Sequence, residues 1–539
     1  MARALPGAAP SARRTAPTGG RATRGAGATP SGRRWRLHPA LAAGLSVAAV
    51  LLAIPRLALG YLHILQHTGM GSRTDFAWMY YAMRVVWLRL QGRLGSSALY
   101  RLASQRAWMR GQRIPFSGLD LYSYPPQFAV AFAPLAALGY RAARTVWTLL
   151  SLGWFLGGVG FACALADVRR DWRVWALLAG VGLACFPALT TFFWGQTDTL
   201  ILFVTAAALW FIYRSRWPAV GGALLALGTL FKLTPAIILA YYAARWALGR
   251  ACDRLRVGGR RPEDRSRLAR DRAVVVSGIA TACAVTALSA AVLGWGPFVA
   301  YLTQVLPQVQ KVALAVGPAP MEQSLRGVLL LFVRPGPGPR VAVDLLSVGA
   351  VAGLLAVDLR HPRGDPRGEA AGVALLSLVC APSLEGHHFV VTALPEVVVG
   401  GWLLQRRDAP RWAVAVAWAA YAAAVLLLTV PGYPFLPRIG RPLCALSGHP
   451  AWITGGHVVA VACDGQHLWS VLLLYALALY AVAVRRPRRG RGVPVPGWPV
   501  RPTKPRRVSR VPFARQGPAV VRRVRPSPRL PPGPAPSRL

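Results

Sequence analysis

Residues 194–249 read WGQTDTLILFVTAAALWFIYRSRWPAVGGALLALGTLFKLTPAIILAYYAARWALG. Three apolar runs fill this stretch, at 198–213, 217–232 and 235–249, with only short polar junctions between them. Each run approaches the length of about 17 to 25 residues that a helix needs to cross a bilayer. The stretch therefore predicts consecutive membrane helices and excludes a soluble domain here.

The composition of the whole chain also favours a membrane fold. Of its 539 residues, 54% are hydrophobic and 15% are charged, whereas soluble proteins carry about 25% charged residues. Further apolar runs raise the number of expected spans to twelve, near 39–61, 145–165, 173–192, 198–213, 217–232, 235–249, 273–293, 340–358, 368–383, 386–404, 411–430 and 468–485. We therefore expect an all-α polytopic membrane protein.

The chain is strongly basic, with a formal net charge of +45. Nucleic-acid binding is the first expectation for such a chain, but its Arg residues lie in tails and loops beside the apolar runs. Arginine in those places sets the topology and contacts anionic lipid, so we expect membrane lipids as partners and no nucleic acid. Lysine occurs only at Lys232, Lys311 and Lys504. Scarce Lys beside abundant Ala, Gly, Pro and Arg indicates a GC-rich genome, such as that of an actinobacterium.

The positive-inside rule orients the spans. Arginine gathers in alternate loops, so we expect these loops and both termini in the cytoplasm, at 169–173, 214–216, 250–272, 360–367 and 406–411. The chain is expected to be a multi-pass protein of the plasma membrane. Its parts are a disordered basic tail at 1–37, a membrane domain at 38–485 and a disordered Arg- and Pro-rich tail at 486–539.

Two segments need separate treatment. The pair Arg33-Arg34 ahead of an apolar run resembles a twin-Arg export signal, but the many later spans favour a retained first helix at 39–61. Residues 124–140 are apolar but short and hold three prolines. We expect a re-entrant or interfacial helix there on the outer side, where irregular backbone must be covered by protein or line a wet cavity.

Uncommon polar residues stand at the opposite, outer ends of the spans. They are Asp75, Tyr124, Gln196, Asp198, Lys232, Ser324, Arg326, Glu385, His387 and His388. Ionisable groups at membrane depth are costly and usually mark a functional site. Cations and histidines beside a carboxylate suit a substrate that carries a phosphate. The cations hold the phosphate, and the carboxylate takes a proton from an attacking hydroxyl.

Several segments resemble glycosyltransferase family 87, a branch of the GT-C superfamily of integral-membrane glycosyltransferases. The resemblance covers roughly residues 70–430, and its pieces are DFAWMYYA (75–82), ALY (98–100), YSYPPQFAVAFAPLAAL (122–138), WGQTDTLILF (194–203), ALGTLFKLTPAIILAYY (226–242), SLRGVLL (324–330) and APSLEGHH (381–388). It implies a GT-C-type fold and an active site on the outer face of the membrane. It also implies a polyprenyl-phosphate sugar donor, typically polyprenyl-phosphate mannose, and a lipid or glycan acceptor. Mycobacterial phosphatidylinositol-mannoside mannosyltransferases are familiar members.

The resemblance also implies roles for the polar residues. The reaction is expected to be inverting and independent of metal and cofactor, with the acidic residue of the first outer loop, here Asp75, as general base. The expected ligands of the donor phosphate are Lys232, Arg326, His387 and His388. The expected substrate-binding residues are Gln196, Asp198 and Tyr124.

The sequence departs from the family pattern at two places. Asp198 stands where the family commonly has Asn two residues after its Gly-Gln pair. Pro382-Ser383-Leu384-Glu385 stands where Ser-Pro, with a Trp nearby, is usual. These departures leave the acceptor and the sugar open, and polyprenyl-phosphate arabinose is an alternative donor.

The roles of the charged candidates have structural alternatives. Asp75 is either a general base beside several aromatic residues or a solvated loop carboxylate. Lys232 is either a phosphate ligand or a lysine that snorkels from a helix end.

The other candidates also have alternatives. His387 and His388 are either phosphate ligands or an interfacial pair with local hydrogen bonds. On an α-helix they would point about 100° apart, so only one is expected to face the site. Gln196 and Asp198 either bind sugar hydroxyls or cap the following helix. Tyr124 precedes two prolines that suit helix initiation.

Metal binding is not expected. His63 and His67 have the i, i+4 spacing of some metal sites, but no matching carboxylate partner follows. Cys444 and Cys463 share one outer loop with three histidines, and on that oxidising side a disulfide is favoured over zinc.

The rival function from another class is a lipid or solute transporter without chemistry. It predicts ionisable residues deep in mid-span and inverted repeats. Here the polar residues gather at one face, which favours an enzyme.

Overall fold

The computed structural model describes residues 75–112, 122–168, 172–255, 262–315, 323–329, 337–361, 364–406, 409–429 and 465–484, with a few isolated positions between 48 and 58. Throughout these ranges the regular structure is helical, without a strand. Several expectations concern residues outside the described ranges, namely most of the first span, both tails, His63, His67, Cys444 and Cys463. The expectations for them stay predictions.

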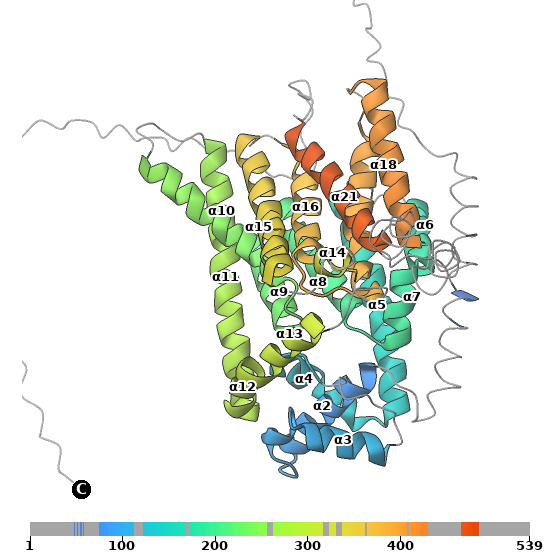
Figure 1. Cartoon of the computed structure of the whole chain (residues 1–539), viewed down its shortest axis with the longest axis vertical. Coiled ribbons are helices and arrows are strands. Elements are labelled where there is room, and N and C mark those ends of the chain that lie inside the picture. Colours follow the sequence, from blue (N-terminus) through green and yellow to red (C-terminus); the bar gives the residue numbers. More distant parts are fainter. Residues whose placement is uncertain are drawn as a thin grey trace, which may run out of the picture. The chain divides into compact units, whose positions relative to one another are not determined.

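The helices follow most of the apolar runs, and Figure 1 shows how they are arranged. In chain order they are α2 (Asp75–Leu90), η1 (Ser96–Ala98), α3 (Leu102–Gly111), α4 (Pro126–Phe132), η2 (Ala133–Ala137), α5 (Tyr140–Leu165), α6 (Trp172–Ala184), α7 (Phe186–Trp194), α8 (Asp198–Arg214), α9 (Pro218–Phe231), α10 (Ala236–Leu255), α11 (Pro262–Leu293), α12 (Gly296–Ala300), the π-helix η3 (Tyr301–Val305), α13 (Leu306–Ala315), α14 (Leu325–Leu329), α15 (Pro337–Arg360), α16 (Pro366–Val379), η4 (Gly386–Thr392), α17 (Ala393–Leu404), α18 (Arg411–Thr429) and α21 (Gln466–Ala483).

The chain is a polytopic membrane protein. Among the described residues six stretches are long and apolar enough to cross a membrane, namely Tyr140–Leu165, Arg265–Leu293, Pro337–Arg360, Gly386–Leu404, Arg411–Thr429 and Gln466–Ala483. A seventh arises if α6 and α7 form one span, although they meet at a bend of 65°. The sequence predicted one span at 173–192, and the structure divides that run into two helices. Pro187, in the first turn of α7, cannot continue a preceding helix, because proline lacks the amide hydrogen and clashes with the preceding turn.

The short segment at 124–140 is helical, as α4 and η2, and α4 begins at Pro126. Both pieces pack against α2, and α4 also meets α9 and α11. Gln127 on α4 is buried and donates to Thr286 on α11, with 2.9 Å between the two atoms. This irregular segment is therefore covered by other helices, as such backbone must be.

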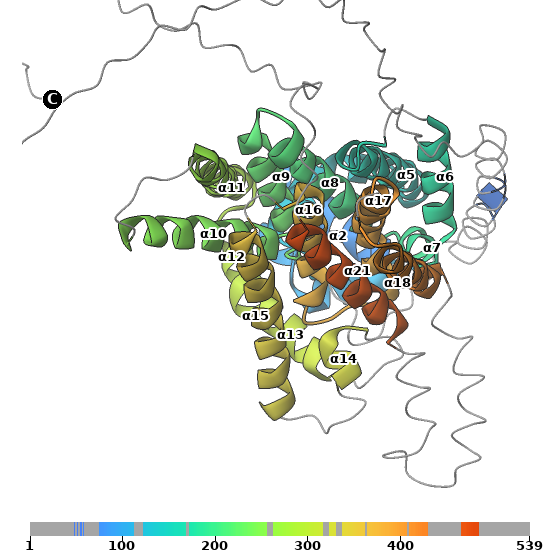
Figure 2. The ribbon, with the colours of Figure 1, turned by 90° about the horizontal axis from the view of Figure 1, so that it is seen from above.

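A chain of contacts runs from α5 to α8, α9 and α11, while α16, α17, α18 and α21 pack on one another, and α17 also meets α5 (Figure 2). Small residues permit the closest approaches. A Cβ atom at Gly222 on α9 would lie 2.1 Å from the carbonyl oxygen of Val274 on α11, so only glycine fits there. Close backbone packing at glycine is typical of membrane helix pairs.

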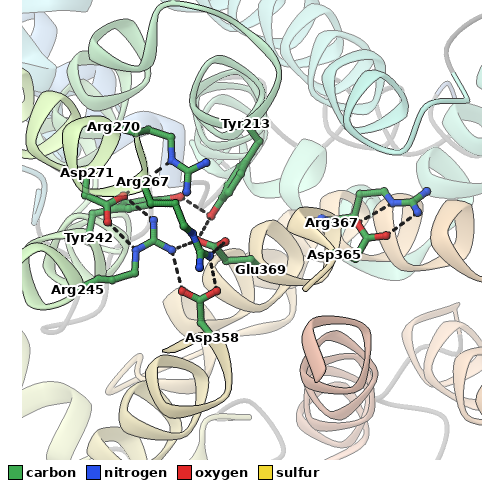
Figure 3. Close-up of polar contacts among 10 residues, drawn as sticks. All are labelled: Tyr213, Tyr242, Arg245, Arg267, Arg270, Asp271, Asp358, Asp365, Arg367 and Glu369. Carbon is green, nitrogen blue, oxygen red and sulfur yellow. Dashed lines mark hydrogen bonds and ion pairs between the residues drawn. The ribbon is translucent and has the colours of Figure 1, made fainter. Parts of the chain in front are cut away.

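A buried network joins α10, α11, α15 and α16 by ion pairs, and α8 by a hydrogen bond from the Tyr213 hydroxyl to Glu369 at 2.6 Å (Figure 3). Its centre is Arg245, whose guanidinium contacts Asp271 at 2.5 Å and Asp358 at 3.1 Å and also pairs with Glu369. Arg267 Nη2 contacts the same two carboxylates, Asp358 at 2.5 Å and Glu369 at 2.9 Å. The Arg245, Asp271, Asp358 and Glu369 side chains are each 5% exposed or less. Buried charges persist only when paired, so the network ties five helices together.

Candidate active site

A sharp turn between α7 and α8 carries two of the predicted site residues. Gly195 ends α7 in the left-handed conformation, with φ +69°. Arg144 on α5 donates from Nη2 to the carbonyl oxygens of Phe192 at 2.7 Å and Phe193 at 2.9 Å. Trp147 on the same helix donates to the carbonyl of Gly195 at 2.8 Å. The turn is therefore fixed from α5 by bonds to carbonyls at the end of α7.

Replacing Gly195 with Ala is expected to destabilise the protein. A Cβ atom there would lie 1.4 Å from Arg144 Nη1 and 2.9 Å from the Cβ of Phe76, and the left-handed conformation itself costs about 1–2 kcal/mol for a residue with a side chain. Gly92→Ala is the matched control, because Gly92 has φ +70° but nothing within 4 Å of the added atom. The measurement is thermal unfolding in detergent. Equal effects of both substitutions would show that Arg144 and Phe76 do not crowd position 195.

Gln196 links Asp75 to Tyr124. Its side-chain Nε2 donates a short hydrogen bond to Asp75 Oδ2, and its Oε1 accepts from the Tyr124 hydroxyl at 2.5 Å. Asp75 begins α2 and is half-buried, and Tyr124 directly precedes the two prolines before α4. Three segments far apart in the sequence thus meet at the predicted general base.

Asp198 pairs with Lys232. Lys232 Nζ contacts Asp198 Oδ1 at 2.8 Å and Oδ2 at 3.0 Å, and the two side chains are 14% and 3% exposed. Lys232 therefore makes an ion pair within the protein instead of extending alone from the helix end. The capping alternative for Asp198 also fails, because Thr197 is the N-cap residue of α8 and makes no side-chain capping bond. Both residues instead hold each other at the junction of α7, α8 and α9.

The two histidines stand next to this pair, in the 3-10 helix η4. His387 Nε2 lies 3.8 Å from Asp198 Oδ2, and its Nδ1 lies 3.7 Å from Glu385 Oε2. His388 Nδ1 accepts from the backbone amide of Glu385 at 2.9 Å, so a neutral His388 ring carries its proton on Nε2.

The two histidines were expected to point about 100° apart, with only one of them facing the site. The His387 and His388 rings stack with their centroids 4.2 Å apart. His387 faces Asp198, and His388 makes the local hydrogen bond expected of an interfacial pair.

Arg326 lies in the short helix α14 and is 6% exposed. The segment before it is tied to the His387 block, because the backbone amide of Gln323 donates to the carbonyl of Leu384 at 2.7 Å. Ser324 Oγ accepts from the amide of Gly327 at 3.2 Å, which closes the turn. The structure thus connects the segment of Arg326 to the segment of the histidines.

Sequence reasoning missed Arg144 as a residue of the site. It is 3% exposed and holds the turn that carries Gln196 and Asp198. One signal could have found it, because Arg144 stands at the end of a span that the positive-inside rule assigns to the outer side. A cation on the side that should lack cations deserves a specific structural reason. His467, one of the three histidines in the loop of Cys444 and Cys463, packs its ring against Phe186 and Phe389, and the described residues hold no cluster able to bind a metal.

Comparison with known proteins supports the resemblance. Residues 122–382 match the family model of Glycosyltransferase family 87. The matched segment contains Tyr124, Gln196, Asp198, Lys232 and Arg326, whereas Asp75 precedes it and the two histidines follow it.

Curated relatives come from mycobacteria. The chain is 27% identical over 402 residues, 67% of this chain and 82% of the relative, to a polyprenol-phosphate-mannose-dependent alpha-(1-2)-phosphatidylinositol mannoside mannosyltransferase of Mycolicibacterium smegmatis. It is 28% identical over 359 residues, 62% of this chain and 75% of the relative, to the protein of the same name from Mycobacterium tuberculosis. It is 26% identical over 347 residues, 63% of this chain and 74% of the relative, to a pentamannoside mannosyltransferase of M. smegmatis. No solved structure matches the chain.

The apolar helices and these matches make the chain similar to a class of proteins, the membrane glycosyltransferases. Within that class the chain is related to glycosyltransferase family 87, and its curated relatives are polyprenol-phosphate-mannose-dependent mannosyltransferases. The mycobacterial relatives also agree with the actinobacterial composition.

Proposed function

We propose that the chain transfers mannose from polyprenyl-phosphate mannose to a mannosylated phosphatidylinositol or similar acceptor on the outer side of the plasma membrane. The donor and acceptor classes come from the names of the relatives. The observation that carries the proposal is that one turn contacts both reacting groups. Gln196 donates to the half-buried carboxylate of Asp75, and Asp198 pairs with Lys232. That arrangement supplies a proton acceptor and a phosphate ligand close together.

The reaction needs one displacement. Asp75 takes the proton of an acceptor hydroxyl, and the oxygen attacks the anomeric carbon of the donor sugar. The bond from that carbon to the phosphate oxygen breaks, and the polyprenyl phosphate leaves with the bonding electron pair. Because the attack and the departure occur on opposite faces of the sugar, the configuration at the anomeric carbon inverts.

The proposal places the site outside the cell, on a membrane domain of about twelve spans. Its support is the position of the site residues at helix ends opposite the Arg-rich loops. The exposed Trp172, Trp217 and Trp412 add support, because each stands beside an arginine at the start of α6, α9 or α18, on the Arg-rich side. Tryptophan is enriched at membrane interfaces.

The test is transfer of labelled mannose in membrane vesicles of both orientations. Vesicles with the outer face exposed are expected to transfer mannose from added polyprenyl-phosphate mannose to phosphatidylinositol mannoside, and inside-out vesicles are not. Polyprenyl-phosphate arabinose serves as the competing donor. Arabinose transfer without mannose transfer would overturn the choice of sugar. Uptake of the lipid donor without any transfer would favour a transporter.

The Asp198–Lys232 pair changes the expected role of Lys232. A donor phosphate meets a lysine whose charge Asp198 already offsets. The ammonium group has three donors, so it can keep one contact with Asp198 and still donate to a phosphate oxygen. Asp198 then holds Lys232 in place, but its negative charge weakens the attraction between Lys232 and the phosphate.

Lys232→Met is expected to raise the KM for the donor at least about tenfold, equivalent to roughly 1.4 kcal/mol of binding. Asp198→Asn, which restores the residue common in the family, is expected to lower that KM, because no carboxylate then offsets the attraction between Lys232 and the phosphate. Steady-state kinetics with varied donor measure both. Lys311→Met is the control, because Lys311 on α13 is exposed. An unchanged KM in Lys232→Met would remove this lysine from the phosphate site.

A further inference from the structure

Both the oxygen and the nitrogen of the Gln196 side-chain amide form hydrogen bonds. Tyr124 donates to its oxygen at 2.5 Å, and its nitrogen donates to Asp75 Oδ2. Gln196 is only 7% exposed, so its amide has little surface left for a sugar hydroxyl. The expected role of Gln196 as a direct substrate ligand therefore fits the geometry poorly.

The Tyr124 hydroxyl decides which way the amide points. Tyr124 lies in the loop before α4, and burial, with the carboxylates of Asp198 and Asp75 nearby, raises the pKa of its hydroxyl well above the usual value. The hydroxyl therefore keeps its proton and donates it to the amide oxygen. The amide nitrogen must then face Asp75, where it can only donate, and an ionised carboxylate only accepts.

Tyr124 is itself held in place. Its backbone carbonyl accepts from the Tyr100 hydroxyl at 2.7 Å, and its ring stacks on Phe128 with 5.1 Å between the centroids. At the other end, the backbone amide of Gln196 donates to the carbonyl of Thr191 at 3.0 Å. Tyr124 and Gln196 are thus both fixed by contacts within the protein that do not involve substrate.

We propose that Gln196 and Tyr124 are positioning residues, a two-step hydrogen-bond relay that orients the Asp75 carboxylate and keeps it ionised for proton removal. This inference rests on the proposed role of Asp75 as general base. It replaces the roles in substrate binding that the sequence predicted for Gln196 and Tyr124. A misplaced reacting group typically costs about 100-fold in rate, so the relay affects the chemical step more than binding.

The variants are chosen to leave the neighbouring charges unchanged. These charges are Asp198 at the start of α8, Glu385 before η4, Lys232 after α9 and Arg144 on α5. Gln196→Met keeps the length of the side chain and removes both bonds. Tyr124→Phe removes only the hydroxyl. Tyr122→Phe is the matched control, because it removes a buried tyrosine hydroxyl that donates to the carbonyl of Pro125 at 3.0 Å.

Gln196→Met is expected to lower kcat by about 10- to 100-fold while the donor and acceptor KM stay within about threefold. Tyr124→Phe is expected to show a smaller loss of the same kind, and Tyr122→Phe little change. A hydrogen bond to a carboxylate favours its charged form. Without that bond the carboxylate protonates at higher pH, so the acidic limb of the kcat profile should move to higher pH in Gln196→Met.

A second readout does not depend on transfer activity. Infrared titration of the purified protein, with Asp75→Asn to identify the Asp75 carboxyl band, should show that band appearing at higher pH in Gln196→Met than in the wild type. This measurement tests the relay even if the wild type transfers no mannose and the proposed function fails. An unchanged band midpoint in Gln196→Met would overturn the relay. A large rise in KM with unchanged kcat would also overturn it and return Gln196 to substrate binding.

Discussion

Asp75→Asn is expected to lower the kcat of mannose transfer by about 10² to 10⁴, the usual loss when a general base is removed. Asparagine keeps the shape of the side chain and an oxygen that can accept from Gln196, but it cannot take the proton of the acceptor hydroxyl. The fold and the donor KM should therefore change little. The measurement is transfer of labelled mannose at saturating donor, with expression and thermal stability checked in parallel.

Asp167→Asn is the matched control for this prediction. Asp167 is also an aspartate that pairs with a polar neighbour, Arg214 at 2.8 Å, but it lies in the exposed loop after α5. Its loss should leave kcat within about twofold, because exposed ion pairs contribute roughly 0–1 kcal/mol. If Asp75→Asn transfers mannose as fast as this control, another group must accept the proton.

Arg245→Met is expected to be the most destabilising single substitution in the described helices. It removes the cation that contacts Asp271, Asp358 and Glu369 together. Removing one partner of a buried ion pair typically costs about 3–5 kcal/mol, because the remaining charges stay buried without compensation. The expected result is a sharp fall in the yield of folded protein and in its unfolding temperature in detergent.

The comparison for that measurement is Arg214→Met. Arg214 pairs with Asp167 at 2.8 Å, but the two side chains are 23% and 54% exposed. Water screens such a pair, so its loss should cost only about 0–1 kcal/mol. Similar unfolding temperatures for Arg245→Met and Arg214→Met would mean that water or rearranged neighbours compensate the buried carboxylates.

The positions of most helices could be predicted, because apolar length alone marks them. The run 386–404 coincides with the candidate span Gly386–Leu404, and 198–213 with α8. The bend at the start of α7 was missed, since an apolar run has the same composition whether or not it bends. The sequence does contain the cause, Pro187, but a proline inside a membrane span often leaves it continuous.

The ion-pair network could not be predicted. Asp271 and Glu369 stand in or beside basic stretches that were assigned to cytoplasmic loops, where a charge normally faces water. Arg245 stood inside an apolar run, which is a warning sign, but its partners are 26, 113 and 124 residues away. Only the packing of α10, α11, α15 and α16 brings them together.

The membership of the candidate site was easier to predict than its bonding. The positive-inside rule placed four of the candidates at the same end of the helices. The structure links them in two pairs, Asp75 with Gln196 and Asp198 with Lys232. The pairing itself depends on the direction of each side chain. Within a turn of three residues, the side chain of Gln196 is directed towards α2 and that of Asp198 towards the end of α9. The spacing of apolar residues along the sequence does not predict these directions.

That turn also acts as a spacer between the two halves of the reaction. Gln196 touches the proposed base and Asp198 touches the proposed phosphate ligand, and only two Cα steps of about 3.8 Å each separate them. If Asp75 and Lys232 act as proposed, the short backbone of this turn limits how far apart the incoming hydroxyl and the departing phosphate can lie. An insertion or deletion within the turn would then change the spacing between the proposed base and the proposed phosphate ligand.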